Sequence, residues 1–79
     1  MLMEINHSFH WKKQRKYRKD IPDDFIVYAV SNSPILRDKI WPNVYNAISR
    51  IPPSGRLLKV VYRRINKDRI IVVTAFWLD

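Results

Sequence analysis

The sequence predicts an α+β fold of two layers, in which two N-terminal helices pack on one face of an antiparallel β-sheet. Helical patterning is confined to the first part of the chain, roughly residues 9–31. The later part is rich in β-branched and aromatic residues, above all in RLLKVVYRRI and DRIIVVTAFW. With 79 residues and 47% hydrophobic content, residues 1–79 are expected to form a single domain with the order β-α-α-β-β-β.

Local signals place the individual elements. Residues 2–6 are predicted to form a short first strand, and Ser8 is expected to cap a helix from Phe9 to Lys19. The IPDD segment supplies a proline and two acids at the start of a second helix, which should end near Ser31. Strands are then expected at ILRDKI (35–40), at VYNAISRI (44–51) and in a closing hairpin after the PPSG turn.

The closing hairpin is expected to separate an apolar face from a mixed face. A two-residue turn at Asn66 and Lys67 pairs Ile65 with Asp68. The face that packs the helices then carries Leu58, Val60, Tyr62, Ile71, Val73 and Ala75, and the mixed face carries Leu57, Lys59, Val61, Arg63, Ile70, Val72, Thr74 and Phe76. A three-residue loop would pair Arg64 with Asp68 instead. We favour the two-residue turn because it segregates polar from apolar side chains more cleanly.

Positive charge dominates the composition, since 15 Lys and Arg oppose 7 Asp and Glu and leave a net charge of +8. Such a field attracts polyanions, and the aromatic residues favour nucleic acid because bases stack on aromatic rings. A basic surface that serves only solubility is the alternative. The chain has no cysteine, no apolar run of about 20 residues and no secretory leader pattern, so we expect a cytoplasmic protein that does not contact membranes.

The stretch HSFHWKKQRKYRKDI (7–21) holds the densest run of cations. On a helical projection Lys12, Lys13, Arg15, Lys16 and Lys19 share one broad side, whereas His7, His10, Trp11, Gln14 and Tyr17 share the other. The cationic side is typical of a solvated surface that steers polyanions. Arg18 falls on the packing side, where it is expected to pair with Asp20 or Asp24, to extend to solvent or to reach the edge of a cleft.

The two histidines do not predict a metal site. Structural zinc takes four ligands, and this chain has neither cysteine nor a third histidine to join His7, His10 and Glu4. A single glycine excludes a Gly-rich phosphate loop, so we expect no metal and no cofactor. Each histidine is readily explained by packing, but histidine is also the side chain best suited to proton transfer near neutral pH.

Several segments carry a likeness to known proteins. They are the N-terminal histidines with Arg15 and Lys19, IPDDFI with a helix ending in AVSNSP, Asp38, a Tyr-Asn strand and RLLKVVYRRINKDRIIVVTAFW. Together they resemble a family of small proteins grouped with the RelE/ParE/BrnT-like toxin superfamily. In the pattern His-x-x-x-Arg-x-x-x-Arg of that family, Arg15 and Lys19 take the basic places, and Trp11 stands at the first place, next to His10.

The resemblance implies a RelE-like fold and a toxin-like RNA-binding protein. Many RelE-like toxins are metal-independent endoribonucleases that cut mRNA at the ribosome through attack of a 2′-hydroxyl on the adjacent phosphate. The implied catalytic groups are His10 or His7 as acid and base, Lys59 and Arg63 as phosphate cations and Tyr45 or Tyr62 as the hydroxyl. The implied nucleic-acid contacts are Arg15, Arg18, Lys12, Lys16 and Lys19, with Phe76 as a stacking surface.

Two other functions remain open. The chain could be a non-catalytic module that binds nucleic acid or the ribosome, or a toxin-like protein that acts by protein contact and binds an acidic antitoxin chain. An oligomer is compatible with each. A site, if present, is expected where His7, His10 and Arg18 meet Lys59 and Arg63 at the sheet.

Overall fold

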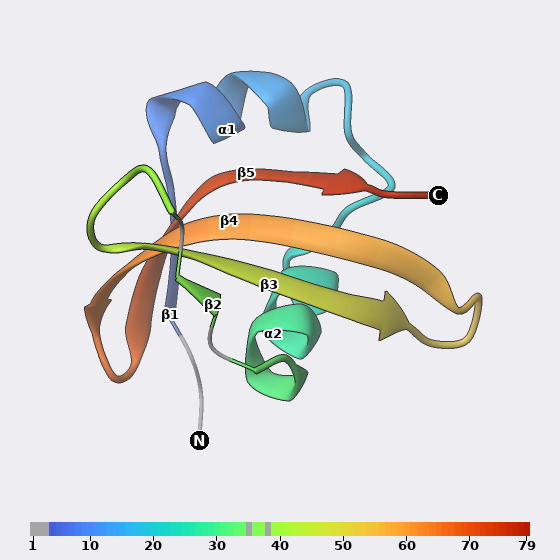
Figure 1. The fold of residues 1–79 in the computed structure, drawn as a ribbon. Coiled ribbons are helices and arrows are strands. Elements are labelled where there is room, and N and C mark those ends of the chain that lie inside the picture. The colour runs from blue at the N-terminus through green and yellow to red at the C-terminus, as the bar shows by residue number, and fades with distance from the viewer. Residues whose placement is uncertain (1–3, 35, 38) are drawn as a thin grey trace.

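The computed structural model describes residues 4–34, 36–37 and 39–79 and has an α+β fold, as predicted (Figure 1). Two helices accompany one five-stranded sheet. The elements in chain order are β1 (Glu4–His7), α1 (Phe9–Arg15), α2 (Asp23–Asn32), β2 (Leu36–Arg37), β3 (Val44–Ile51), β4 (Arg56–Asn66) and β5 (Arg69–Trp77).

The sheet is mixed, with the strand order β1-β5-β4-β3-β2. Strands β2 to β5 form an antiparallel meander, but β1 pairs with β5 in parallel. Four strands follow α2, in the four segments predicted to form strands, although the predicted order β-α-α-β-β-β counts only three. The predicted antiparallel sheet is wrong in its first strand, which pairs in parallel. A parallel pair needs a long crossover, which the intervening elements supply. The Glu4 N–H donates to the Asp68 carbonyl at 2.6 Å, and Arg69 Nε donates to the Glu4 carboxylate at 2.7 Å.

The two helices occupy different places relative to the sheet. Helix α2 packs on β3 and β4 through its buried residues Ile26, Ala29 and Val30. Helix α1 instead runs along β5, where the pairing with β1 has stopped (Figure 1). The Ser8 N–H donates to the Val72 carbonyl at 3.0 Å and so begins this arrangement. The prediction that both helices pack on one face holds for α2, whereas α1 sends only Trp11 into the core.

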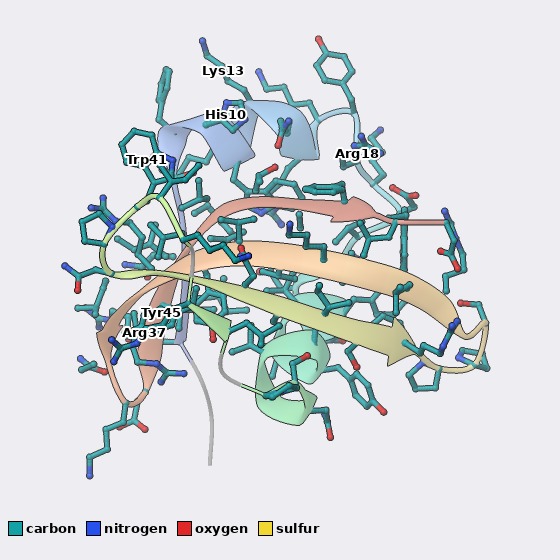
Figure 2. All side chains as sticks on the ribbon, viewed as in Figure 1. His10, Lys13, Arg18, Arg37, Trp41 and Tyr45 are labelled. Carbon is teal, nitrogen blue, oxygen red and sulfur yellow. The ribbon has the colours of Figure 1, made fainter. Side chains whose placement is uncertain are left out.

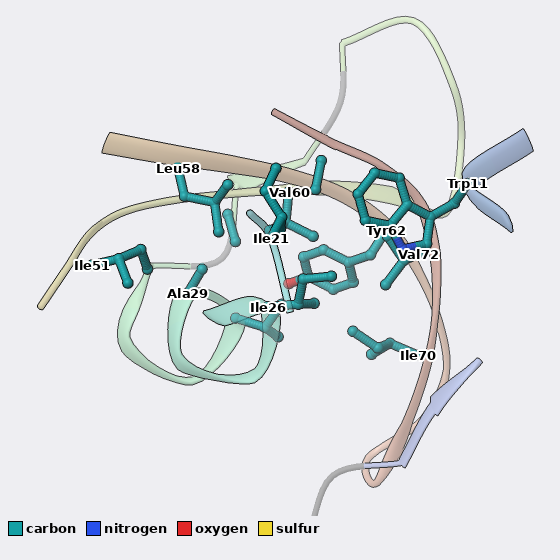
Figure 3. Packing of buried hydrophobic residues seen from close by; sticks show 13 residues of the cluster. Trp11, Ile21, Ile26, Ala29, Ile51, Leu58, Val60, Tyr62, Ile70 and Val72 are labelled. Atoms are coloured by element: carbon teal, nitrogen blue, oxygen red, sulfur yellow. The ribbon is translucent and has the colours of Figure 1, made fainter. Parts of the chain in front are cut away.

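The core lies between the sheet and α2, and Trp11 closes its α1 end beside Tyr62 and Val72 (Figure 3). Trp11 is fully buried, and Leu58, Val60, Tyr62 and Ala75 are buried as predicted. Burial of one large apolar side chain contributes about 1.5–3 kcal/mol. The periodic apolar positions of β4 therefore identify the packed face of the sheet correctly.

The β4–β5 hairpin has neither of the registers predicted. Asn66 pairs with Arg69, so Lys67 and Asp68 are the turn residues, and the Asn66 side chain accepts from the Asp68 N–H at 2.9 Å. The register shifts once between Arg64 and Asn66, next to the turn. It shifts again between Val61 and Tyr62, where β5 has one extra residue. The buried residues of β5 are consequently Ile70, Val72 and Ala75, and the predicted inward positions of Ile71 and Val73 are wrong.

Helix and strand ends show where local signals succeed. Ser8 caps α1 as predicted, since its Oγ accepts from the Trp11 N–H at 3.1 Å. The helix ends at Arg15 rather than at Lys19, because the Tyr17 and Arg18 N–H groups turn back to the Gln14 carbonyl and the chain descends to bury Ile21. Helix α2 ends one residue beyond the predicted Ser31.

The two short strands differ from their predicted ranges. The first strand begins in the described part of the chain at Glu4 and continues to His7, while residues 2–3 of the predicted range lie outside the described residues. Within the strand predicted at 35–40, the described strand residues are Leu36–Arg37 of β2, and residues 39–40 are not part of it. Positions 35 and 38, and with them the Asp38 of the family resemblance, also lie outside the described residues.

Candidate nucleic-acid interface

One face of the sheet is not packed against α2, and we call it the open face. Alternation along the strands places on it Val44, Asn46, Ile48 and Arg50 of β3, Leu57, Lys59, Val61 and Arg63 of β4, and Ile71, Val73, Thr74 and Phe76 of β5. The bulge in β5 brings both Val73 and Thr74 to this face. Among the described residues, helix α1 borders the open face along β5 (Figure 1).

Two of the predicted cations lie on the open face. Lys59 is opposite Phe76 in the register, and its Nζ lies 5.9 Å from the centre of the Phe76 ring. Arg63 is exposed and lies between Val44 and Ile71 in the neighbouring strands. Four residues of strand separate their Cα atoms by about 13 Å, so the two cations can contact different phosphates of one strand.

The segment between β2 and β3 adds an aromatic wall to the open face. Asn43 has a φ of 62°, a left-handed conformation that Asn tolerates, and it turns the chain into β3. The Trp41 side chain just before it is 65% exposed. Trp41 and Pro42 border a hollow of about 550 Å³ whose other lining residues are Val44, Val61, Val73 and Arg63. This hollow, which we call the Trp41 hollow, combines an aromatic wall, an apolar floor and a cation.

A second hollow of about 300 Å³ lies on the other side of the same segment. It shares Trp41, Pro42 and Val44 with the first and adds Arg37, Asn43 and Tyr45. Figure 2 shows Arg37 and Trp41 at the same end of the sheet. Trp41 therefore stands between two cations, Arg63 in one hollow and Arg37 in the other.

Helix α1 contributes one polar side to the border of the open face. The Thr74 hydroxyl donates to Gln14 Oε1 at 2.6 Å, which fixes the side of α1 that faces this border. His10 lies one turn earlier on the same side of the helix, and its side chain is exposed (Figure 2). Of the two histidines, His10 is thus the one close to the open face.

His7 belongs to a separate polar cluster with Arg15 and Asp23. Arg15 Nη1 donates to His7 Nδ1 at 3.1 Å, so the ring carries its proton on Nε2 and donates it to Asp23 Oδ1 at 3.0 Å. Arg15 Nη2 also lies 3.6 Å from Asp23 Oδ1. The cluster joins the end of β1 to α1 and to the first turn of α2. The prediction that His7 meets Lys59 and Arg63 is therefore wrong, because hydrogen bonds to Arg15 and Asp23 hold it at the helical layer.

The two tyrosines predicted as hydroxyl donors are not on the open face. Tyr45 and Tyr62 are paired across β3 and β4, and their rings stack at a centroid distance of 5.8 Å. Tyr62 is only 2% exposed and belongs to the core. Alternation places both rings on the side packed by α2, as predicted for Tyr62, so neither hydroxyl lies on the face that holds Lys59 and Arg63.

The remaining basic residues of the N-terminal stretch are exposed. Lys12, Lys16, Arg18 and Lys19 all face solvent, and Figure 2 shows Lys13 pointing away from the sheet. Arg18 was expected on the packing side, but α1 ends before it and it forms no ion pair within the described ranges. Tyr17, expected on the same side, is 88% exposed. Asp20 accepts instead from Trp77 Nε1 at 2.8 Å.

Comparison with known proteins identifies no relative of this chain. Neither the known protein families nor the curated proteins nor the solved structures include a match. Among the described residues, no group of three or more His, Cys, Asp or Glu side chains is arranged to hold a metal ion. No helix in that part of the chain is long and apolar enough to cross a bilayer.

Sequence patterning missed the residues that shape the hollows. Neither Trp41 nor Arg37 is among the site residues that the sequence predicts, although both line the hollows. Periodicity cannot distinguish a core tryptophan from an exposed one, and here Trp11 is fully buried whereas Trp41 is 65% exposed. The available signal was the position of Trp41 in a turn rather than in a periodic segment. The contact between His7 and Asp23, 16 residues apart, had no local signal.

Proposed function

We propose that this chain is an RNA-binding protein that holds the RNA backbone and bases on the open face of its sheet. The observation that carries the proposal is the combination of Lys59, Arg63, Phe76 and Trp41 around one uncovered surface. Arg binds phosphate through two parallel N–H groups, Lys supplies a mobile charge, and exposed rings accept bases by stacking.

The charge of the whole chain supports this proposal. A net charge of +8 strengthens the attraction of a polyanion before any contact forms. The exposed lysines of α1 do not belong to the open face. They therefore contribute to the attraction of the RNA more than to the fit of the bound strand. The contacts that fix the RNA then belong to the open face.

Binding of a fluorescently labelled, unstructured RNA oligonucleotide at several salt concentrations tests the proposal. We expect log Kd to depend linearly on log salt concentration. Each of Lys59→Gln and Arg63→Gln should weaken binding and reduce the slope by about 0.7, the value for loss of one contact with a single-stranded phosphate.

Arg64→Gln is the matched control for Arg63→Gln. It removes the same charge at the next residue of β4, on the opposite side of the sheet. We expect it to change the slope much less. Salt-independent binding, or equal losses for Arg63→Gln and Arg64→Gln, would contradict binding through the open face.

A toxin-like endoribonuclease activity is the second candidate, and the position of His10 favours it. His10 is exposed on the side of α1 that contacts Thr74, at the border of the face that holds Lys59 and Arg63. An imidazole there can exchange a proton with a 2′-hydroxyl or a leaving oxygen, while the two cations stabilise the charge of the pentavalent phosphorane. No step of this reaction requires a metal.

The cleavage proposal is tested with RNA in the presence of a chelator and with mRNA in a translating extract. We expect a product ending in a 2′,3′-cyclic phosphate. His10→Gln should abolish the product and leave the affinity for RNA within about twofold. If RNA stays intact under both conditions, the cleavage proposal fails, and the binding measurements above still decide whether the chain binds RNA.

A further inference from the structure

We infer that the Trp41 hollow is a subsite for one unpaired nucleobase, which makes the protein selective for single-stranded over double-stranded RNA. This inference rests on the proposed RNA binding and adds to it the form of the RNA and the residue that reads it. The argument depends on the shape of the hollow, on its lining and on the exposure of Trp41.

The lining of the hollow suits a flat heteroaromatic ring. Val44, Val61 and Val73 form an apolar floor from three neighbouring strands, and Trp41 and Pro42 supply a wall. Its volume of about 550 Å³ lies within the range of pockets that hold small organic molecules. A base inserted here buries its faces against apolar groups and keeps its polar edge toward solvent.

The charges around the hollow specify the rest of the ligand. Arg63 lines the hollow itself. Lys59 lies four residues away in β4, on the same face of the sheet. A free aromatic molecule would need only the apolar floor and the wall. A nucleotide within a strand also brings phosphates on both sides of its base, for which Arg63 and Lys59 are suitable partners.

The position of Trp41 requires the base to be unpaired. In a duplex each base is stacked between its neighbours and presents only its edge in a groove, so no ring face is available. An unpaired base can stack on the indole, an interaction of about 1–3 kcal/mol per base. A single strand therefore gains affinity from the hollow that a duplex of the same sequence cannot gain.

Tryptophan emission gives a direct readout, because the other two tryptophans are less accessible. Trp11 is fully buried, and Trp77 is half-buried beneath the Arg56 guanidinium, 4.2 Å from its ring centre. We expect an unstructured single-stranded RNA to quench the emission. The quenching should disappear in Trp41→Phe, which retains a ring for stacking and hence most of the affinity.

Affinities of Trp41 variants complete the test. Trp41→Ala should weaken the binding of the single strand by about 5- to 150-fold, the equivalent of one stacking interaction. The affinity for the duplex should change less than twofold. Tyr17→Ala is the control, since it removes a ring that is 88% exposed but does not line the hollow, and it should have no effect.

The outcomes separate this inference from the proposed function. If the wild type binds RNA in a salt-dependent way but Trp41→Ala binds it equally well, or if duplex and single strand bind alike, the base subsite is refuted and RNA binding stands. If the wild type binds neither RNA, the proposed function is refuted and the subsite with it. Quenching by the single strand together with a selective loss in Trp41→Ala supports the subsite.

Discussion

At the scale of single residues, the polar cluster of His7, Arg15 and Asp23 shows that His7, a predicted catalytic acid or base, has a structural role. The His7 ring accepts from Arg15 and donates to Asp23, and its side chain is 17% exposed. Both ring nitrogens are engaged. A proton-transfer role would require one of these contacts to break, so the cluster is better explained as a connection between β1, α1 and α2.

This explanation predicts a difference between two adjacent acids of α2. Asp23→Ala and Asp24→Ala each remove one carboxylate from the first helical turn and lose the same favourable interaction with the helix dipole. Asp23→Ala additionally leaves His7 Nε2 and Arg15 without their acceptor. We expect it to lower the free energy of unfolding by about 1 kcal/mol more than Asp24→Ala in urea titrations. Equal losses would contradict a stabilising role of the cluster.

The buried indole of Trp11 leads to a second prediction at this scale. Its Nε1 is buried and makes no hydrogen bond with any described residue, a cost of about 1–3 kcal/mol. Trp11→Phe removes this unpaired donor as well as part of the ring, so the two effects partly cancel. We expect Trp11→Phe to lower the free energy of unfolding by no more than about 1.5 kcal/mol, and Trp11→Ala by about 3–5 kcal/mol. Thermal and urea unfolding measure both losses. If Trp11→Phe lowered the free energy of unfolding as much as Trp11→Ala, the unpaired N–H would carry no penalty.

At the scale of elements, local signals predicted what local chemistry controls. The Ser8 cap, the start of α2 after IPDD and the inward face of β4 could all be predicted, because each depends on residues a few positions apart. The pairing of β1 with β5 could not, since it joins Glu4 to Arg69 across nearly the whole chain. The face of β5 depends on one extra residue in a bulge, which alternation alone does not reveal.

The β5 bulge gives a prediction that distinguishes the observed register from simple alternation. Ile70 is fully buried, whereas its neighbour Ile71 is half-buried on the open face. We expect Ile70→Ala to lower the free energy of unfolding by about 2–5 kcal/mol and Ile71→Ala by no more than about 1 kcal/mol. The two substitutions are chemically identical, so in urea unfolding each variant is the control for the other. A larger loss for Ile71→Ala than for Ile70→Ala would instead support the register that simple alternation predicts.

The candidate site follows the same division. Lys59, Arg63 and Phe76 were predicted on one face because the strand period places them there, and the structure brings them together. Trp41 lies in an irregular segment whose direction depends on the left-handed Asn43, and no period applies to such a segment. The hollow depends on the arrangement of three strands beneath Trp41, so the sequence pattern does not predict it.

At the scale of the whole molecule, the excess of positive charge and the open face have separable roles. In the proposed RNA binding, the net charge of +8 acts at long range and accelerates the encounter, whereas contacts on the open face would hold the bound strand. Lys12, Lys16 and Lys19 are exposed on α1 and the turn after it, whereas Lys59 and Arg63 belong to β4. We therefore expect them to contribute mainly to the encounter.

Stopped-flow measurements with an unstructured RNA can separate the two roles. We expect a variant with Lys12→Gln, Lys16→Gln and Lys19→Gln to associate several-fold more slowly at low salt, because three charges of the steering field are lost, and to dissociate at nearly the wild-type rate. Arg63→Gln removes one charge from the bound contact, so its main effect should be faster dissociation. Raising the salt concentration should erase the association difference, since exposed charges are then screened. If the triple variant instead dissociates faster than Arg63→Gln, helix α1 rather than the open face is the surface that holds the RNA.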